Sequence, residues 1–416
     1  MRKRCTSPLL GARTFLNWKF FFAVALSCTR TLLHPDQLQQ SPFPYLTGIG
    51  ATWDYTSSKP IRSLSAGLLQ YPLMYTATPI SLQIFLSRLG FGLCSLWSLP
   101  DVPGCPWYMW LVPLMFCCTT FTNAMEALLV SLAVNTARNC VFGAAVGVAF
   151  VARPSTSPMF LLLPSLSRMR DSSLSGRLTL ALSVIAAASA MCLIDSYLYG
   201  FWTVPPLNNL LYNLSHSSSH GTSHPASVLL HLFLLYGPVL LPLCRHIARD
   251  ENRINMRLAS LLFPVAALAA SPHKETRFLL PTYPLLFSYL KYRRVAHAKR
   301  PSSHPFRVFR GVFVLQIIFS AIVIFFLGLL HQGRILESVL KAKSDTVYWN
   351  TYPPPSFLNR EVSITWTLAD AEQQSSFNFT NITVVTDRKI PQWKERECWP
   401  YNWSGEGGNE LCFYDR

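Results

Sequence analysis

The hexapeptide His273–Phe278, with the sequence His-Lys-Glu-Thr-Arg-Phe, places four ionisable side chains between two apolar runs at 258–271 and 278–290. Charged groups at a membrane boundary are costly unless they pair with each other or meet a ligand. The histidine, lysine and arginine can all be cationic, and such a set suits the phosphate of a ligand at the bilayer surface. The alternative is a basic boundary whose long side chains simply reach out to water.

The first polar loop, residues 34–63, carries a second candidate. It begins with His34-Pro35-Asp36, where the proline turns the chain out of the preceding helix and leaves Asp36 near the membrane surface. A carboxylate there can act as general base on a hydroxyl group, although an aspartate beside a turn is also an ordinary loop residue. Asp54 and Arg62 follow in the same loop, beside aromatic residues that suit either a sugar or the membrane interface.

Two more acidic residues lie within or at the end of apolar runs. Glu126 is a functional candidate because a carboxylate is costly inside a membrane segment. Its alternative is structural: a hydrogen bond between helices, or an ion pair with Arg138 or Arg153. Asp195 lies at the polar end of the run 178–198. No Cys or His spacing typical of a metal site occurs in the chain, so we expect no metal.

The composition is that of an integral membrane protein. Of the 416 residues, 50% are hydrophobic and 13% are charged, and the mean hydropathy is +0.26. The formal net charge of +16 would suggest nucleic acid in a soluble protein. Here the Lys and Arg residues lie between apolar runs, which indicates membrane topology, and no nucleic-acid-binding motif is present, so we expect no nucleic-acid partner.

Membrane-spanning helices must position the candidate residues. A span takes roughly 20 apolar residues, or somewhat fewer if the helix is broken. The candidate spans lie at 14–33, 64–87, 107–122, 124–137, 139–152, 178–198, 227–244, 258–271, 278–290 and 309–330. We expect an all-α multi-pass membrane domain over residues 1–330, with about 8–11 transmembrane helices and an uncleaved first helix.

Charge and sequons predict which loops face which side. The loops rich in Lys and Arg, which the positive-inside rule places in the cytosol together with the N-terminus, are 168–177, 245–257 and 291–310. The alternating segments are then lumenal, and they are 34–63, 199–226, 271–277 and the tail from 331. N-glycosylation sequons fall only in those lumenal segments, at Asn213, Asn378, Asn381 and Asn402.

The tail after residue 331 changes in composition. Short stretches at 347–349, 362–368 and 382–386 are rich in β-branched and aromatic residues, which predicts a small lumenal β-rich cap over residues 331–416. Cys398 and Cys412 lie in this polar tail and could form a disulfide if it faces an oxidising lumen.

The order of the motifs resembles one family, the dolichol-phosphate-mannose-dependent α-mannosyltransferases of the endoplasmic reticulum, glycosyltransferase family 22. The resemblance covers most of residues 30–290, and the hexapeptide is its most specific part. The motifs that carry it are His34-Pro35-Asp36, Phe121–Glu126, Arg153-Pro154, Asp195–Gly200, Pro206–Asn213, Gly221–Pro225 and His273–Phe278.

The resemblance implies a multi-spanning GT-C fold and a dolichyl-phosphate-mannose donor, with no cofactor. Because the donor sugar is β-linked and the product is α-linked, one displacement with inversion is enough. Asp36 would then deprotonate the acceptor hydroxyl, and His273, Lys274 and Arg277 would bind the donor phosphate. The residues in supporting roles would be Glu275, His34, Asp54, Arg62, Glu126 and Asp195.

Within the family, the tail segment Val347–Pro355 resembles the branch that adds the fourth mannose to the glycosylphosphatidylinositol precursor. The chain departs from the pattern at Lys274, where that branch often has Gln, and at Gln37, where the family usually has a second acid. The partners implied are a lipid donor and a glycosylphosphatidylinositol or lipid-linked glycan acceptor. The alternatives are a sister-branch mannosyltransferase for the third mannose or for a dolichol-linked oligosaccharide, a catalytically inactive relative, and a membrane transporter.

Overall fold

The computed structural model describes residues 53–70, 80–98, 111–117, 122–215, 223–250, 255–297 and 312–330, together with five strands between residues 346 and 415. The predictions for His34 and Asp36, for the first apolar run and for Asn378, Asn381 and Asn402 lie outside the described residues.

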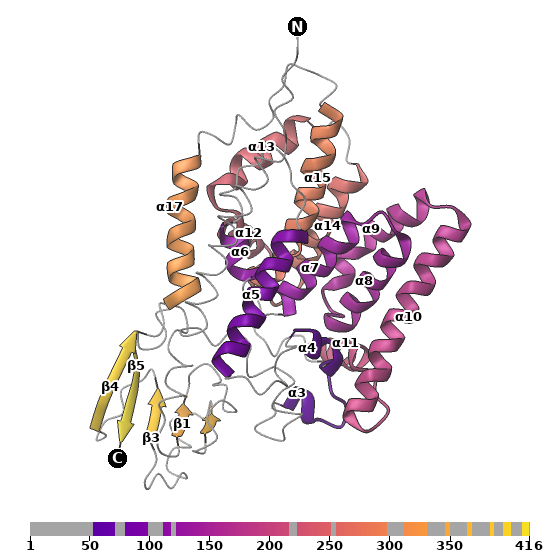
Figure 1. The fold of residues 1–416 in the computed structure, drawn as a ribbon. Coiled ribbons are helices and arrows are strands. Elements are labelled where there is room, and N and C mark those ends of the chain that lie inside the picture. The colour runs from indigo at the N-terminus through magenta and orange to yellow at the C-terminus, as the bar shows by residue number, and fades with distance from the viewer. Residues whose placement is uncertain are drawn as a thin grey trace.

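The described helices form a bundle (Figure 1), with α10 along one edge and α17 along the other. The first of them are α3 (Trp53–Thr56), α4 (Leu64–Gln70), α5 (Ile80–Ser98), α6 (Leu111–Cys117), α7 (Thr122–Asn135), α8 (Asn139–Ala152), α9 (Ser157–Asp171) and α10 (Leu174–Tyr199). Those that follow are α11 (Pro205–Ser215), α12 (Ser227–Tyr236), α13 (Leu240–Asp250), α14 (Met256–Ala270), α15 (Thr282–His297) and α17 (Phe313–Val323). Short 3₁₀ helices cover Gly237–Val239 and Thr276–Leu279, and a π-helix covers Ile324–Leu330.

Helix α8 has the bounds predicted from the sequence, whereas the run 64–87 is divided between α4 and α5. Pro79 directly precedes α5. Proline has no amide hydrogen to donate and is well tolerated only at a helix start, so it marks a boundary rather than the middle of a span. The apolar pattern did not predict α9 and α11, because both carry many polar residues.

Two described helical segments are each long and apolar enough to cross a membrane unaided: Leu174–Tyr199 and Ser227–Arg245. Helices α6 and α7 meet that test only as a pair bent by 112°. The remaining apolar helices are shorter, so the predicted number of about 8–11 spans stays a prediction.

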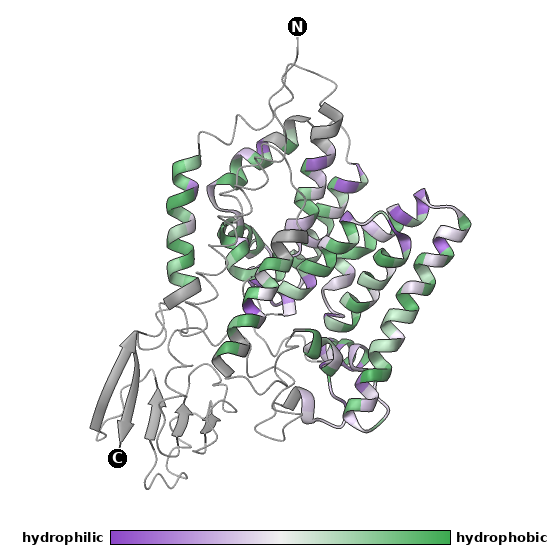
Figure 2. Ribbon diagram, viewed as in Figure 1, coloured by the Kyte–Doolittle hydropathy of each residue, from purple (hydrophilic) through white to green (hydrophobic). Residues whose placement is uncertain are grey.

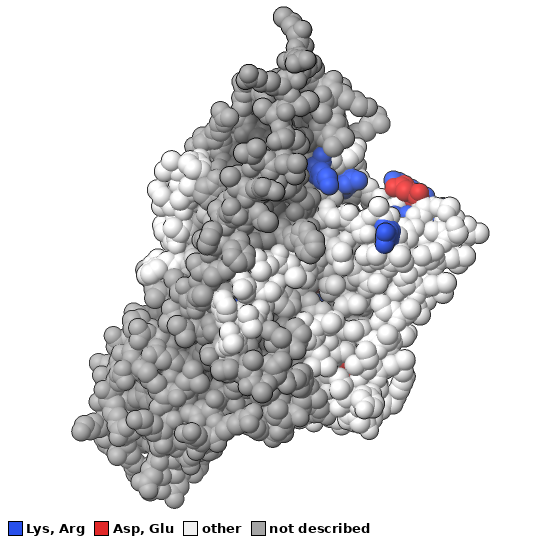
Figure 3. All heavy atoms as spheres, in the orientation of Figure 1, with Lys and Arg blue, Asp and Glu red and all other residues white. Residues whose placement is uncertain are grey.

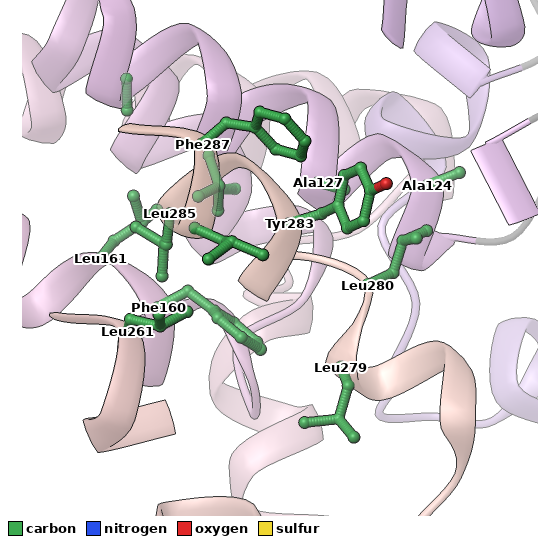
Figure 4. Packing of buried hydrophobic residues seen from close by; sticks show 14 of the residues in the cluster. Ala124, Ala127, Phe160, Leu161, Leu261, Leu279, Leu280, Tyr283, Leu285 and Phe287 are labelled. Atoms are coloured by element: carbon green, nitrogen blue, oxygen red, sulfur yellow. The ribbon is translucent and has the colours of Figure 1, made fainter. Parts of the chain in front are cut away.

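The core of the bundle lies where α7, α9, α14 and α15 meet. Figure 4 shows the side chains that fill it, from Ala124 and Ala127 of α7, Phe160 and Leu161 of α9, Leu261 of α14, and Tyr283, Leu285 and Phe287 of α15. Phe160 and Phe287 are fully buried. Helices in lipid associate mainly through such close packing, because lipid tails are as apolar as the side chains.

The outer face of helix α10 is also apolar, but unlike the core it is exposed. Figure 2 shows hydrophobic residues along its length. Many are exposed, such as Leu178, Leu182 and Ile185, whereas its buried residues are Leu180, Met191, Asp195 and Tyr199. An apolar face that no other part of the described chain covers is the pattern expected of a helix that faces lipid.

Two glycines allow α10 to pack against α8. A Cβ atom on Gly147 would lie 2.5 Å from the Val184 carbonyl oxygen, and one on Gly143 would lie 2.5 Å from the Leu180 carbonyl oxygen. The backbones therefore approach as closely as small residues at a four-residue spacing permit.

We expect Gly147→Val to lower the free energy of unfolding by about 1–3 kcal/mol, because the added atoms force two backbones apart. Thermal unfolding of the detergent-purified protein measures the change. Gly90→Val is the matched control, since no atom beyond its chain neighbours and its own helix backbone lies within 4 Å of the added Cβ there. Equal stability of the two variants would contradict this account of the α8–α10 contact.

The turns between helices gather at two ends of the bundle. At one end, Ser223 donates its amide to the Pro272 carbonyl and the Tyr199 hydroxyl donates to the Arg62 carbonyl. We call this the hexapeptide end. At the other, which we call the basic end, Arg168 bonds to Asn139 at the start of α8. Lys and Arg gather at the basic end, above a surface with little charge (Figure 3). The described loops thus separate into the two groups that the charge pattern predicts.

Five strands follow the helices: β1 (Thr346–Trp349), β2 (Ile364–Thr367), β3 (Thr383–Thr386), β4 (Lys394–Pro400) and β5 (Glu410–Asp415). Their order in the sheet is β2-β1-β3-β5-β4, with β1 parallel to β2 and β3, and β5 antiparallel to β3 and β4. Cys398 stands opposite Cys412 in the β4–β5 register. The disulfide between them and the separate lumenal cap stay predictions.

Candidate functional site

The hexapeptide connects α14 to α15. Its backbone is extended at Glu275, with φ −138° and ψ 152°, and it then turns into the 3₁₀ helix Thr276–Leu279. The Glu275 carboxylate bridges the side chains of His273 and Arg277: it lies 2.9 Å from His273 Nε2 and 2.7 Å from Arg277 Nε. Arg277 Nη2 also donates to Glu275 Oε1 at 2.8 Å, which makes the pair bidentate. The predicted orienting role of Glu275 therefore has a geometric basis.

The charge state of Glu275 follows from these contacts. Burial raises its pKa, but the hydrogen bond from His273 and the charge of Arg277 outweigh burial and lower the pKa to about 2. The carboxylate is consequently ionised at neutral pH and holds both partners in place.

This pKa gives a pH prediction. A group whose pKa is lowered by folding stabilises the protein above its unfolded pKa, here about 4.5, and the effect is lost as the pH falls toward the folded value of about 2. We expect thermal stability to fall in that window and Glu275→Gln to make the fall shallower. Unfolding temperatures recorded in detergent between about pH 6 and pH 3 test it; identical slopes for both proteins would rule out this contribution.

Basic side chains contact the Phe278 ring. The Arg153 guanidinium carbon lies 5.4 Å from the ring centroid and that of Arg277 lies 5.8 Å from it. The His273 ring meets the same ring edge-on at 5.7 Å. The charges of Arg62, Arg277 and Glu275 also act on the Arg153 guanidinium. Two arginines far apart in the sequence, Arg153 and Arg277, thus meet at one aromatic side chain.

Arg153 itself is fixed by the turn that follows α8. Its Nη1 donates to the Thr122 hydroxyl at 3.2 Å and its Nε to the Thr156 hydroxyl at 3.4 Å. Burial lowers its pKa to about 10, which the nearby Glu126 carboxylate opposes, so the guanidinium stays charged at neutral pH.

Glu126 stabilises that same turn. It is fully buried in α7 and accepts hydrogen bonds from the Thr156 hydroxyl at 2.7 Å and the Ser157 hydroxyl at 2.9 Å. The sequence left a functional and a structural interpretation of Glu126 open. The contacts of Glu126 are those of the structural interpretation, in which it bonds to the start of a neighbouring helix and interacts with Arg153. It thereby fixes the turn that carries Arg153, and its supporting role at the site stays a prediction.

The segment that carries Arg62 is clamped by three polar side chains. Asp195 Oδ1 accepts from the Ser65 amide at 2.7 Å at the start of α4, the Tyr199 hydroxyl donates to the Arg62 carbonyl at 2.8 Å, and Asn208 donates to the Pro60 carbonyl at 3.0 Å. Asp195 is fully buried. Asp195 therefore holds the start of α4 against α10, beside the segment that carries Arg62, and its supporting role at the site stays a prediction.

Lys274 contacts other parts of the chain than Glu275 does. Its ammonium donates to the Ser223 carbonyl at 2.9 Å and to the Ser271 carbonyl, and only 7% of the residue is exposed. These bonds tie the hexapeptide to the loop before α12. Thr276 bonds to His231 at 3.0 Å. The predicted contact of Lys274 with phosphate stays a prediction, and the structure gives this residue a positioning role.

We expect Lys274→Met to lower the free energy of unfolding by about 2–3 kcal/mol, since two carbonyls lose a charged donor. If positioning is its main role, turnover should fall alike at limiting donor and at limiting acceptor. Steady-state kinetics with each substrate varied in turn checks this. A rise confined to the donor KM, with stability unchanged, would instead assign Lys274 to the phosphate.

Asp54 and Asn213 are the other predicted residues that belong to described helices. Asp54 belongs to the short helix α3, and its side chain lies outside the described residues. Asn213 donates to the Asn209 carbonyl at 2.9 Å within α11, so its use as a glycosylation acceptor stays a prediction. Among the described residues no group of three His, Cys, Asp or Glu could hold a metal ion. Sequence reasoning did not include Arg153 or His231 among the site residues.

The arrangement can bind a phosphate group. Arg62, Arg153 and Arg277 supply more positive charge than Glu275 and Glu126 cancel, and Glu275 keeps two of the donors fixed. Preorganised cations of this kind stabilise negative charge that grows on a leaving group.

Comparisons with known proteins give a consistent result. The sequence model of the Alg9-like mannosyltransferase family matches residues 104–367. GPI mannosyltransferase 4 of Yarrowia lipolytica is 26% identical over 415 residues, covering 83% of this chain and 77% of the relative. The protein of that name from Debaryomyces hansenii is 25% identical, covering 82% and 79%. The crystal structure of apo ArnT from Cupriavidus metallidurans is similar over 98% of both chains, with a TM-score of 0.55 and 12% identity, and so shares the fold.

Proposed function

The chain belongs to the Alg9-like mannosyltransferase family, and from that premise we propose that it transfers mannose from dolichyl phosphate mannose to a glycosylphosphatidylinositol precursor. It is a multi-pass membrane protein with a GT-C fold. The relatives named GPI mannosyltransferase 4 favour the fourth, α-1,2-linked mannose as the one added.

One observation carries the proposal beyond the family name. Arg62 of the first loop lies within electrostatic range of Arg153, which packs on Phe278 of the hexapeptide. The described part of the first loop, residues 53–63, and the hexapeptide therefore belong to the same end of the molecule. A base from one and a phosphate-binding group from the other can serve a single reaction.

The chemistry requires one displacement. The acceptor hydroxyl oxygen forms a bond to C1 of mannose while the bond from C1 to the phosphate oxygen breaks, and the configuration inverts. Asp36 takes the proton of the hydroxyl, and dolichyl phosphate leaves with the bonding electrons. Holding both reactants in line supplies much of the rate.

The described residues take definite roles in this scheme. Arg277, Arg153 and His273 stabilise the charge that grows on the departing phosphate, and Arg62 adds to the same field. Glu275 orients His273 and Arg277, and Lys274 fixes the loop that carries them. No metal or cofactor takes part.

The topology in this proposal follows the charge pattern. The hexapeptide end faces the lumen of the endoplasmic reticulum, the basic end faces the cytosol, the N-terminus is cytosolic and the tail with its sheet is lumenal. The donor lipid lies in the bilayer beside the helices.

The decisive experiment identifies the lipid that accumulates when the protein is removed from its cell. A glycosylphosphatidylinositol precursor with three mannoses, restored to four by the wild-type chain, supports the proposal. A truncated dolichol-linked oligosaccharide, or a precursor with two mannoses, would move the protein to a sister branch. Purified membranes with labelled dolichyl phosphate mannose then test turnover directly; no transfer would indicate a catalytically inactive relative.

A further inference from the structure

A cavity of about 530 Å³ lies at the basic end of the bundle. Its walls come from the α7–α8 turn, the α9–α10 turn and the facing parts of α14 and α15. Asn139, which begins α8, lines the cavity, whereas Arg153 follows the other end of that helix. Fourteen helical residues span about 20 Å. The cavity is therefore separate from the candidate active site.

Two arginines supply positive charge at its wall. The Arg168 guanidinium is held by the Asn139 side chain at 2.7 Å, by the Thr136 carbonyl at 3.0 Å and by the Ala137 carbonyl. Arg257 is exposed, and its Nη1 donates to the Ser288 hydroxyl at 3.1 Å while its guanidinium lies 4.9 Å from the Tyr292 ring centroid. Both charges are thus held in position before any ligand arrives, which lowers the cost of binding an anion.

The other polar groups of the wall suit an anion as well. Hydroxyls from the α9–α10 turn and from three helices line the cavity: Ser172 and Ser173 of the turn, Ser167 of α9, Ser260 of α14 and Ser288 of α15. The acid in the lining, Asp171, is already paired with Arg170, whose Nε lies 3.0 Å from it, and both side chains are largely exposed. The positive charge of Arg168 and Arg257 is therefore not cancelled by that carboxylate.

The rest of the cavity is apolar and borders the lipid-facing surface. Val134, Phe142 and Leu285 form part of the wall. Leu166 of α9 and Leu174 of α10, beside the lining residues Ser167 and Ser173, are 47% and 72% exposed. A ligand that fits both parts has an anionic head for the arginines and a hydrocarbon tail for the outer face. The volume is in the usual range for small-molecule sites.

We propose that this cavity binds the phosphate headgroup of an anionic membrane lipid, on the face of the protein opposite the active site. Arg257 and Arg168 contact the phosphate, and the lipid tail lies along α9 and α10. The Ser172 and Ser288 hydroxyls, which accept hydrogen bonds from Asn139 and Arg257, donate to the phosphate. This site is distinct from the place where the donor phosphate is proposed to bind.

The test uses the full-length protein in nanodiscs of phosphatidylcholine that contain a small fraction of phosphatidic acid. Native mass spectrometry then counts the lipids retained per chain. We expect one phosphatidic acid to be retained by the wild type and retention to fall about tenfold or more in Arg257→Gln, since a charged hydrogen bond is lost. Ser288→Phe keeps every charge and narrows the cavity, so it should lower retention too.

Arg245→Gln is the matched control, because Arg245 of α13 is exposed and lies outside the cavity lining. It should retain the lipid as the wild type does, and thermal unfolding of each variant separates lipid loss from misfolding. Equal loss in Arg245→Gln, or no preference for phosphatidic acid over phosphatidylcholine, would overturn the proposal. Displacement of the lipid by an equal concentration of inorganic phosphate would assign the site to free phosphate instead.

Discussion

Asp36→Asn is expected to reduce mannose transfer by about 100- to 10,000-fold, because asparagine cannot accept the proton of the acceptor hydroxyl. The side chain keeps its size, so membrane insertion and thermal stability should match the wild type. The measurement is single-turnover transfer from labelled dolichyl phosphate mannose by the purified protein. Asp36→Glu, which restores a carboxylate at a different reach, should recover part of the rate.

Gln37 makes this experiment more informative. The family usually has a second acid at this position, and a chain that needs that acid would be inactive as it stands. If the wild type does not turn over but Gln37→Asp does, the inactive reading is correct. If the wild type is active and Asp36→Asn is equally active, Asp36 has no part in the mechanism and another residue of the first loop must take the proton.

The sequence was most informative where a pattern is local. The apolar run at 139–152 predicted α8 correctly, because its ends coincide with Asn139 and with the Arg153-Pro154 stop. The hexapeptide could be selected as a candidate site because its ionisable residues are adjacent. The division into two groups of loops followed from the positions of Lys and Arg alone.

The rest could not be predicted, because it depends on contacts between distant segments. Arg153 is more than a hundred residues from Phe278, and its sequence neighbours identify it only as a helix end. Asp195 was a functional candidate because it is acidic and near a membrane boundary, and only the fold shows that it accepts the Ser65 amide. In the hexapeptide, residue types alone grouped Lys274 with Arg277, whereas the structure bonds Lys274 to the Ser223 carbonyl and Arg277 to Glu275.

The second large effect is expected at Arg277. Arg277→Gln should lower the rate of transfer by about 100- to 1,000-fold, because a donor to the departing phosphate is lost where its charge develops. The loss should appear mainly in kcat if Arg277 acts in the transition state, and in the donor KM if it only binds the ground state.

Arg277→Lys separates charge from geometry, because lysine keeps the charge but cannot form the bidentate pair with Glu275 that holds the arginine in place. Its rate should lie between those of the wild type and Arg277→Gln. Arg138→Gln is the matched control for a lost arginine, since Arg138 is exposed at the opposite end of α8, and its rate should equal that of the wild type. A wild-type rate in Arg277→Gln would show that the hexapeptide is only a basic membrane boundary, and the phosphate would then have to be bound by Arg62 and Arg153 without it.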